Sequence, residues 1–141
     1  MRNIVVTACS NFDTHRNRDY FSSLLTLISS VHLYSYDVCD KIYVYNLGLS
    51  NDKIEYLQKI KKVEVINFSD CCNTYYPEYL TPWYHGYKLF VLKDASKFGE
   101  NILWLDSGIC LCKDIQEIFN FIDRDHIFLI IFLKINLMVL L

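Results

Sequence analysis

Short apolar runs typical of β-strands alternate along this chain with segments whose apolar residues recur every three or four positions. That second spacing gathers apolar side chains on one face of a helix. The first run, residues 4–8, is apolar almost throughout, as in a strand buried on both faces of a sheet. Further strands are predicted at residues 42–45, 63–68 and 102–105, with extended pieces at 109–112 and 127–132.

Helical periodicity fills the intervals between most of these runs. Helices are predicted over residues 21–32, 54–60, 84–98 and 114–122. Ser50 is expected to cap the second helix, Gly99 to end the third, and an acidic capping box at 114–117 to open the fourth. Strands that alternate with helices predict an α/β fold, with a Rossmann-like, mostly parallel sheet and helices on both faces.

The composition excludes several classes of protein. Of the 141 residues, 52% are hydrophobic and 21% charged, which excludes a disordered chain. The net charge of -2 offers no electrostatic reason to bind nucleic acid. Six cysteines are too few for a small disulfide scaffold, and none has the spacing of a zinc site. Cys110 and Cys112 are expected to pack as small hydrophobic side chains.

The two ends of the chain carry different signals. The first apolar run is about half as long as the core of a signal peptide, so we expect a cytoplasmic protein. Residues 127–141 are apolar except for Lys134 and Asn136, yet a membrane-spanning helix needs about 20 such residues. A buried strand at 127–132 is the favoured interpretation, and a tail anchor is the alternative. A third interpretation is that the chain is truncated or frameshifted there.

In parallel sheets, ligands bind beyond the carboxyl ends of the strands, where the strand order reverses. Asp106 directly follows the run at 102–105 and precedes Ser107 and Gly108. A carboxylate held there suits a divalent cation, but Asp-Ser-Gly is also ordinary turn chemistry. Lys88, on the third predicted helix, either reaches Asp106 or a phosphate, or carries its ammonium into solvent. Neither common glycine-rich phosphate motif occurs.

Four short segments occur in a familiar order. They are Thr-Ala-Cys-Ser-Asn at 7–11, Tyr-Asn-Leu-Gly-Leu-Ser at 45–50, Tyr-Lys-Leu at 87–89 and Trp-Leu-Asp-Ser-Gly at 104–108. Over residues 3–126 the chain resembles the N-terminal half of a GT-A-fold glycosyltransferase. It is similar to glycogenin-like and related nucleotide-diphospho-sugar transferases.

The resemblance implies a donor site for a nucleotide sugar, with a UDP-sugar expected and a saccharide or protein as acceptor. Asp106 would match the first Asp of the DxD motif and bind Mn²⁺ or Mg²⁺ with the donor. Lys88 would match a basic residue that contacts the phosphates or the Asp motif. Residues 7–11 would cradle the base and ribose, and Asp13 in the following loop is a weaker candidate for that role. The nucleotide-binding residues implied are Thr7, Ala8, Cys9, Asn11, Lys88 and Asp106.

The sequence departs from the family pattern in two places. The third DxD position is Gly108, so one expected carboxylate is missing. The resemblance also stops before the acceptor half of the family, which we expect this chain to lack. We therefore expect a truncated domain at 1–126 followed by an apolar tail at 127–141. A catalytically inactive nucleotide-sugar-binding relic is the alternative function. The aromatic-rich segment 71–87 either lines a sugar groove or packs over the sheet edge.

Overall fold

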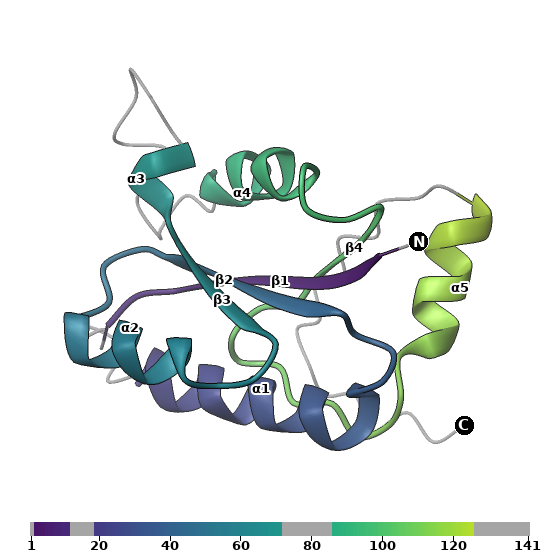
Figure 1. Ribbon diagram of the computed structural model, residues 1–141, viewed down its shortest axis with the longest axis horizontal. Helices are drawn as coiled ribbons and strands as arrows, with labels where there is room; N and C mark the ends of the chain where they lie inside the picture. The colour runs from purple at the N-terminus through teal and green to yellow at the C-terminus, as the bar shows by residue number, and fades with distance from the viewer. Residues whose placement is uncertain (1, 12–18, 72–85, 126–141) are drawn as a thin grey trace.

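The computed structural model describes residues 2–11, 19–71 and 86–125, and their architecture is α/β (Figure 1). The predicted fold class is confirmed: a Rossmann-like, all-parallel sheet lies between helices. The strands are β1 (Asn3–Cys9), β2 (Lys41–Asn46), β3 (Val63–Asn67) and β4 (Asn101–Trp104). The helices are α1 (Tyr20–Ser35), α2 (Asn51–Gln58), α3 (Phe68–Cys71), α4 (Tyr87–Ala95) and α5 (Gln116–Asp125).

The sheet has the strand order β3-β2-β1-β4. The chain moves outward from β1 through β2 to β3, and then returns to place β4 on the other side of β1. The strand order therefore reverses between β1 and β4, the position where such sheets bind ligands. The last pair of the β1–β4 ladder joins Val6 to Trp104, whereas the β1–β2 ladder continues to Cys9 and Asn46.

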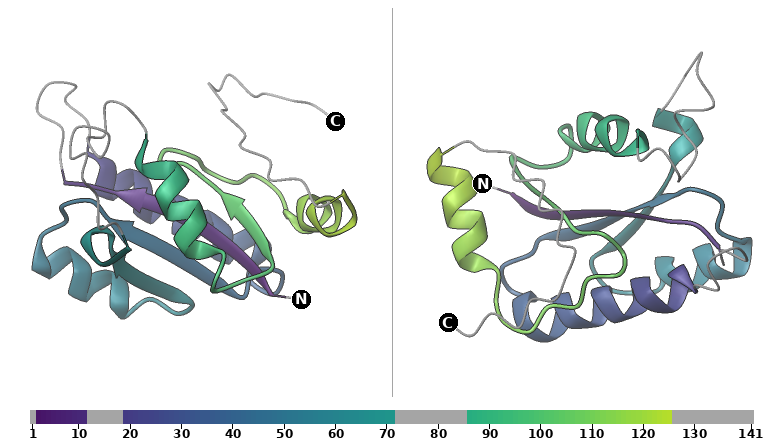
Figure 2. Two further views of the ribbon diagram at one scale, coloured as in Figure 1. Left: turned by 90° about the horizontal axis from the view of Figure 1, so that it is seen from above. Right: turned by 180° about the vertical axis from the view of Figure 1, so that it is seen from behind.

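Helices cover both faces of the sheet, and each face has its own core. α1 and α2 lie on one face, and α3 and α4 lie on the other (Figures 1 and 2). α5 packs against β4 at the edge of the sheet. The core beneath α1 includes Val5, Leu24, Leu27, Val44, Leu103 and Phe119, and the core beneath α4 includes Val6, Tyr43, Tyr45, Val91 and Trp104.

Polar groups fix several element boundaries. Asp19 caps α1, because its carboxylate accepts hydrogen bonds from the Ser22 hydroxyl and from the Ser22 and Phe21 backbone N–H groups. These bonds hold the pKa of Asp19 below its ordinary value. Ser50 stands at the cap of α2 as predicted, but its side chain makes no capping hydrogen bond.

Residues 109–112 were predicted to be extended, and the structure corrects this interpretation, since they belong to no strand. The Ile109 N–H donates to the Asp106 carbonyl at 2.9 Å, which closes a turn. The Leu111 N–H donates to Ser30 Oγ at 2.9 Å instead of to a neighbouring strand. The prediction that Cys110 and Cys112 are packed is also wrong, since both thiols are exposed on this loop.

The predicted role of Gly99 is a second correction. α4 ends at Ala95, so Gly99 lies past the helix and just before β4. A Cβ at Gly99 would come within 2.8 Å of Ile4 Cγ2 and 3.1 Å of the Arg2 carbonyl oxygen. Glycine is therefore required here by the close approach of the amino end of β1, and not by a helix terminus.

Several predictions fall outside the described residues: Asp13, the segment 72–85, the strand at 127–132 and the tail at 127–141. Within the described ranges, no helix is long and apolar enough to cross a membrane.

Candidate functional site

Asp106 stands at the reversal of strand order. The Leu105 N–H donates to the Val6 carbonyl at 3.0 Å, so the ladder continues one residue beyond β4 and delivers Asp106 next to β1. The turn that follows uses the Asp106 carbonyl oxygen, which accepts from the Ile109 N–H. The Asp106 carboxylate takes no part in that backbone bond. The turn interpretation of Asp-Ser-Gly is therefore confirmed for the backbone, and the cation interpretation stays a prediction for the carboxylate.

The Asp106 carboxylate is held by one cation and one aromatic donor. Lys88 Nζ lies 2.7 Å from Asp106 Oδ1, and Trp104 Nε1 donates to the same oxygen at 2.8 Å. Lys88 Nζ also lies 5.4 Å from the centre of the Trp104 ring, within the range of a cation–π contact. The structure thus brings together Lys88 and Asp106, two residues singled out from the sequence.

The two charges of this pair have different surroundings. The Lys88 side chain is 9% exposed and the Asp106 side chain is 45% exposed. A lysine buried to that degree needs a counter-charge, and Asp106 supplies it. Because the carboxylate is half open to solvent, it remains reachable by a ligand while it neutralises the ammonium.

Tyr87 adds a neutral hydroxyl to the surroundings of the Lys88–Asp106 pair. Burial raises the pKa of Tyr87 to about 12, and the negative charge of Asp106 acts in the same direction. Its ring centre lies 6.3 Å from that of Trp104 in a tilted arrangement. Tyr87 therefore keeps its proton at neutral pH and contributes a hydroxyl group, not a charge.

The side chains at the carboxyl end of β1 are less accessible than a nucleotide cradle requires. Thr7 is fully buried, and Ala8 and Cys9 are 7% and 2% exposed. Thr7 Oγ1 is buried and has no hydrogen-bond partner among the described residues. Burial raises the pKa of Cys9 to about 12, which makes its thiol a poor nucleophile or ligand at neutral pH. In this arrangement a ligand would meet their backbone, not their side chains.

Asn11 takes part in a different set of contacts. Its Oδ1 accepts from Lys53 Nζ at 3.2 Å and from the Ser50 N–H at 3.4 Å, which ties the loop after β1 to the start of α2. Lys53 also lies 5.0 Å from the centre of the Phe21 ring. No contact of Asn11 with the Lys88–Asp106 pair occurs among the described residues.

The neighbouring turn after β2 contains the Asn-Leu-Gly-Leu-Ser segment. Asn46 Oδ1 accepts from the Gly48 and Leu49 N–H groups at 2.8 and 2.6 Å. Gly48 has φ +124°, which a residue with a side chain rarely adopts. The Leu47 N–H donates to the Cys9 carbonyl at 2.9 Å, so this turn closes against the end of β1.

The donor set limits which metal could bind at this site. No group of three or more His, Cys, Asp or Glu side chains in the described parts of the chain could hold a metal ion. Asp106 offers one half-exposed carboxylate, and a hard divalent cation commonly binds one or two carboxylates together with ligand phosphates. The residues therefore fit a cation shared with a diphosphate, and do not fit a metal caged by protein side chains alone.

Trp104 and Tyr87 are the site residues that sequence reasoning missed, since both resemble core aromatics. One available signal was the spacing of Trp104 and Asp106, because residues two apart in an extended chain point to the same side.

A scan against models of known protein families matches none, and a search of curated proteins finds no match.

Proposed function

We propose that this chain binds a nucleotide sugar, with a UDP-sugar as the expected donor, at the carboxyl edge of β1 and β4. In this proposal it acts as the donor-binding part of a glycosyltransferase whose acceptor is a saccharide or a protein. The observation that carries the proposal is the Lys88–Asp106 pair at 2.7 Å, placed where the strand order of a parallel sheet reverses. The resemblance of residues 3–126 to nucleotide-diphospho-sugar transferases supports the choice of ligand.

The two charges suit a diphosphate bound with a metal ion. Asp106 would share Mn²⁺ or Mg²⁺ with the diphosphate, and a metal bound there would act as a Lewis acid on the leaving phosphate oxygens. Lys88 adds a positive charge that is already paired and positioned, so ligand binding would not have to desolvate it. The backbone of residues 7–11 would face the base and ribose.

A second candidate function is a binding module that performs no transfer. Gly108 favours it, since the position two residues beyond Asp106 carries no carboxylate. A Cβ there would meet no atom of the described residues within 4 Å. With one carboxylate in place, the site could bind a nucleotide but would lack the second carboxylate that holds the metal for catalysis.

The proposal is tested by calorimetric titration of UDP into the chain, in Mn²⁺ and in EDTA. We expect Mn²⁺ to tighten UDP binding in the wild type, and Asp106→Asn to abolish that gain because the amide cannot neutralise the metal. Glu117→Gln, which removes an exposed carboxylate on α5, is the matched control and should behave as wild type. Equal UDP affinity with and without Mn²⁺ in both wild type and Asp106→Asn would contradict the proposal.

The two candidate functions differ in turnover. A transferase domain should release UDP from a UDP-sugar, even to water, when acceptor is absent, and a binding module should not. GDP serves as the nucleotide control in both assays. Metal-dependent UDP binding without any release of UDP from UDP-glucose or UDP-galactose would favour the binding module.

A further inference from the structure

The two oxygens of the Asp106 carboxylate are in different surroundings. Oδ1 accepts hydrogen bonds from Lys88 Nζ and from Trp104 Nε1. In the described part of the chain no donor to Oδ2 is found, and the Asp106 side chain is 45% exposed. One oxygen is thus anchored to the protein, and the other has no donor among the described residues.

We propose that Trp104 is a positioning residue, which anchors Oδ1 of Asp106 together with Lys88 so that Oδ2 is presented to a divalent cation bound with the diphosphate. This inference rests on the proposed function, because it names how that site orients its one carboxylate. It differs from the expected role of Asp106, since it assigns a task to a side chain that touches neither nucleotide nor metal.

Trp104 is suited to this task by its own immobility. It is 3% exposed, and it ends β4, where it pairs with Val6 of the central strand. Its ring packs in the core beneath α4 beside Tyr87. An indole N–H only donates, and a buried one that loses its acceptor is costly, so Trp104 and Asp106 each restrict the other.

Lys88 and Trp104 make separable contributions to the carboxylate. Lys88 supplies the opposite charge, whereas Trp104 supplies a neutral, directional bond from a fixed ring. Mutation of a group that orients a metal-binding side chain commonly weakens metal affinity about 10- to 100-fold. Trp104→Phe should therefore leave the Lys88–Asp106 ion pair in place and make only the orientation of Oδ2 less fixed.

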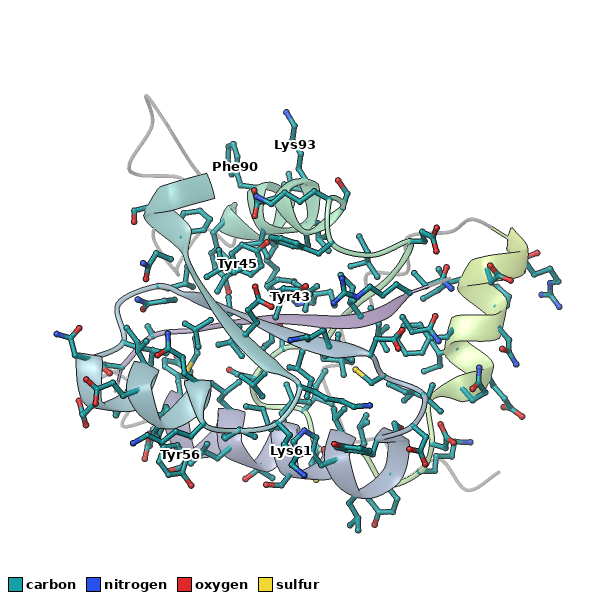
Figure 3. All side chains as sticks on the ribbon, viewed as in Figure 1. Tyr43, Tyr45, Tyr56, Lys61, Phe90 and Lys93 are labelled. Atoms are coloured by element: carbon teal, nitrogen blue, oxygen red, sulfur yellow. The ribbon has the colours of Figure 1, made fainter. Side chains whose placement is uncertain are left out.

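The first measurement compares UDP affinity in Mn²⁺ and in EDTA for wild type and Trp104→Phe. The ratio of the two affinities is the gain supplied by the metal, and we expect Trp104→Phe to reduce it about tenfold. UDP affinity in EDTA should be unchanged. Lys93→Met, which removes an exposed lysine pointing away from the sheet on α4, is the control and should keep the full gain (Figure 3). A full metal gain in Trp104→Phe overturns the inference.

A second measurement needs neither nucleotide nor a stable Trp104 variant. In ¹⁵N-labelled wild type, the indole N–H signal of Trp104, assigned with a Trp83→Phe variant, should sit downfield of its own position in the urea-unfolded chain. It should move upfield in Lys88→Met/Asp106→Ala, which removes the acceptor without stranding a buried lysine. An indole signal that does not respond to loss of Asp106 overturns the inference.

Titration with Mn²⁺ alone separates failure of this inference from failure of the proposed function. A cation on Oδ2 should broaden the Trp104 indole signal before the backbone N–H signals of residues 3 and 4, at the opposite end of β1. If UDP does not bind but this selective broadening occurs, the nucleotide proposal fails and the role of Trp104 stands. If UDP binds equally in Mn²⁺ and EDTA and no broadening occurs, the inference fails and only metal-free nucleotide binding remains.

Discussion

Gly99 and Gly108 show that two glycines close together in the sequence are needed to different degrees. Gly99 packs against Ile4, which is fully buried, whereas the space around Gly108 is open. Neither backbone lies in the left-handed region, so side-chain clearance alone decides what each position tolerates. The close packing at the start of the β1–β4 ladder therefore requires a residue without a Cβ at position 99.

Replacement of Gly99 by alanine should destabilise the protein. The new methyl group would have to displace Ile4 Cγ2 and the Arg2 carbonyl, and overpacking of a core costs about 1–3 kcal/mol. We expect the free energy of unfolding in urea to fall by that amount, with an unchanged slope. Gly108→Ala is the matched control and should lie within about 0.5 kcal/mol of wild type. Equal stability of the two variants would show that the amino end of β1 shifts freely.

At the scale of elements, α4 is joined to β2 by a buried tyrosine. Tyr43 and Tyr45 project from β2 toward α4 (Figure 3), and the Tyr45 hydroxyl donates to Asp94 Oδ2 at 2.8 Å. Lys97 Nζ lies 2.6 Å from the other oxygen of Asp94. This bond fixes the last turn of the helix whose first turn carries Lys88, so it also supports the candidate site.

Tyr45→Phe removes this bond while it keeps the ring. Tyr45 is fully buried, and a hydrogen bond to a charged group contributes about 1.5–3 kcal/mol. The free energy of unfolding should fall by about that amount, measured by circular dichroism in urea. Tyr56→Phe on α2 removes a hydroxyl from a tyrosine that is 54% exposed and should have no measurable effect. A neutral result at both positions would mean that apolar contacts alone hold α4.

The sequence predicted the regular elements better than their boundaries. Apolar runs located β1, β2 and β4 within one residue, because a strand buried on both faces must be mostly apolar. β3 was located equally well although its Glu64 and Asn67 are exposed. The run at 109–112 was misjudged because alternation of cysteine with apolar residues also describes a loop whose Leu111 faces the core. The extent of α4 was overestimated, since 84–98 includes residues that form turns after Ala95.

The candidate site was predictable only where a rule about topology applied. Asp106 was found because it follows a strand, and Lys88 because a lysine near an apolar helix face is unusual. The spacing of Trp104 and Asp106 permits their hydrogen bond but does not establish it, and no local pattern shows that Thr7 is fully buried. The burial of Thr7 depends on which elements cover β1, and a sequence pattern does not specify their order.

At the scale of the whole molecule, the cysteines report separately on the surface and on the core. Cys110 and Cys112 are exposed, whereas Cys9 and Cys39 are buried on the α1 side of the sheet. Burial raises the pKa of Cys9 to about 12 and that of Cys39 to about 11, so almost no reactive thiolate forms at either position near pH 8. Labelling of the two classes therefore measures different events.

In a Cys71→Ser/Cys72→Ser variant, we expect an aromatic disulfide reagent at pH 8 to label two thiols rapidly and two others slowly. The slow pair should react at a rate set by opening of the sheet core, because protection by burial is lost only when the core opens. The logarithm of the slow rate should rise in proportion to the loss of stability in urea, and Gly99→Ala should speed the slow phase further. The fast phase should respond to neither change. Four thiols that react together in native buffer would contradict the prediction, because they would show that the core beneath α1 does not protect Cys9 and Cys39.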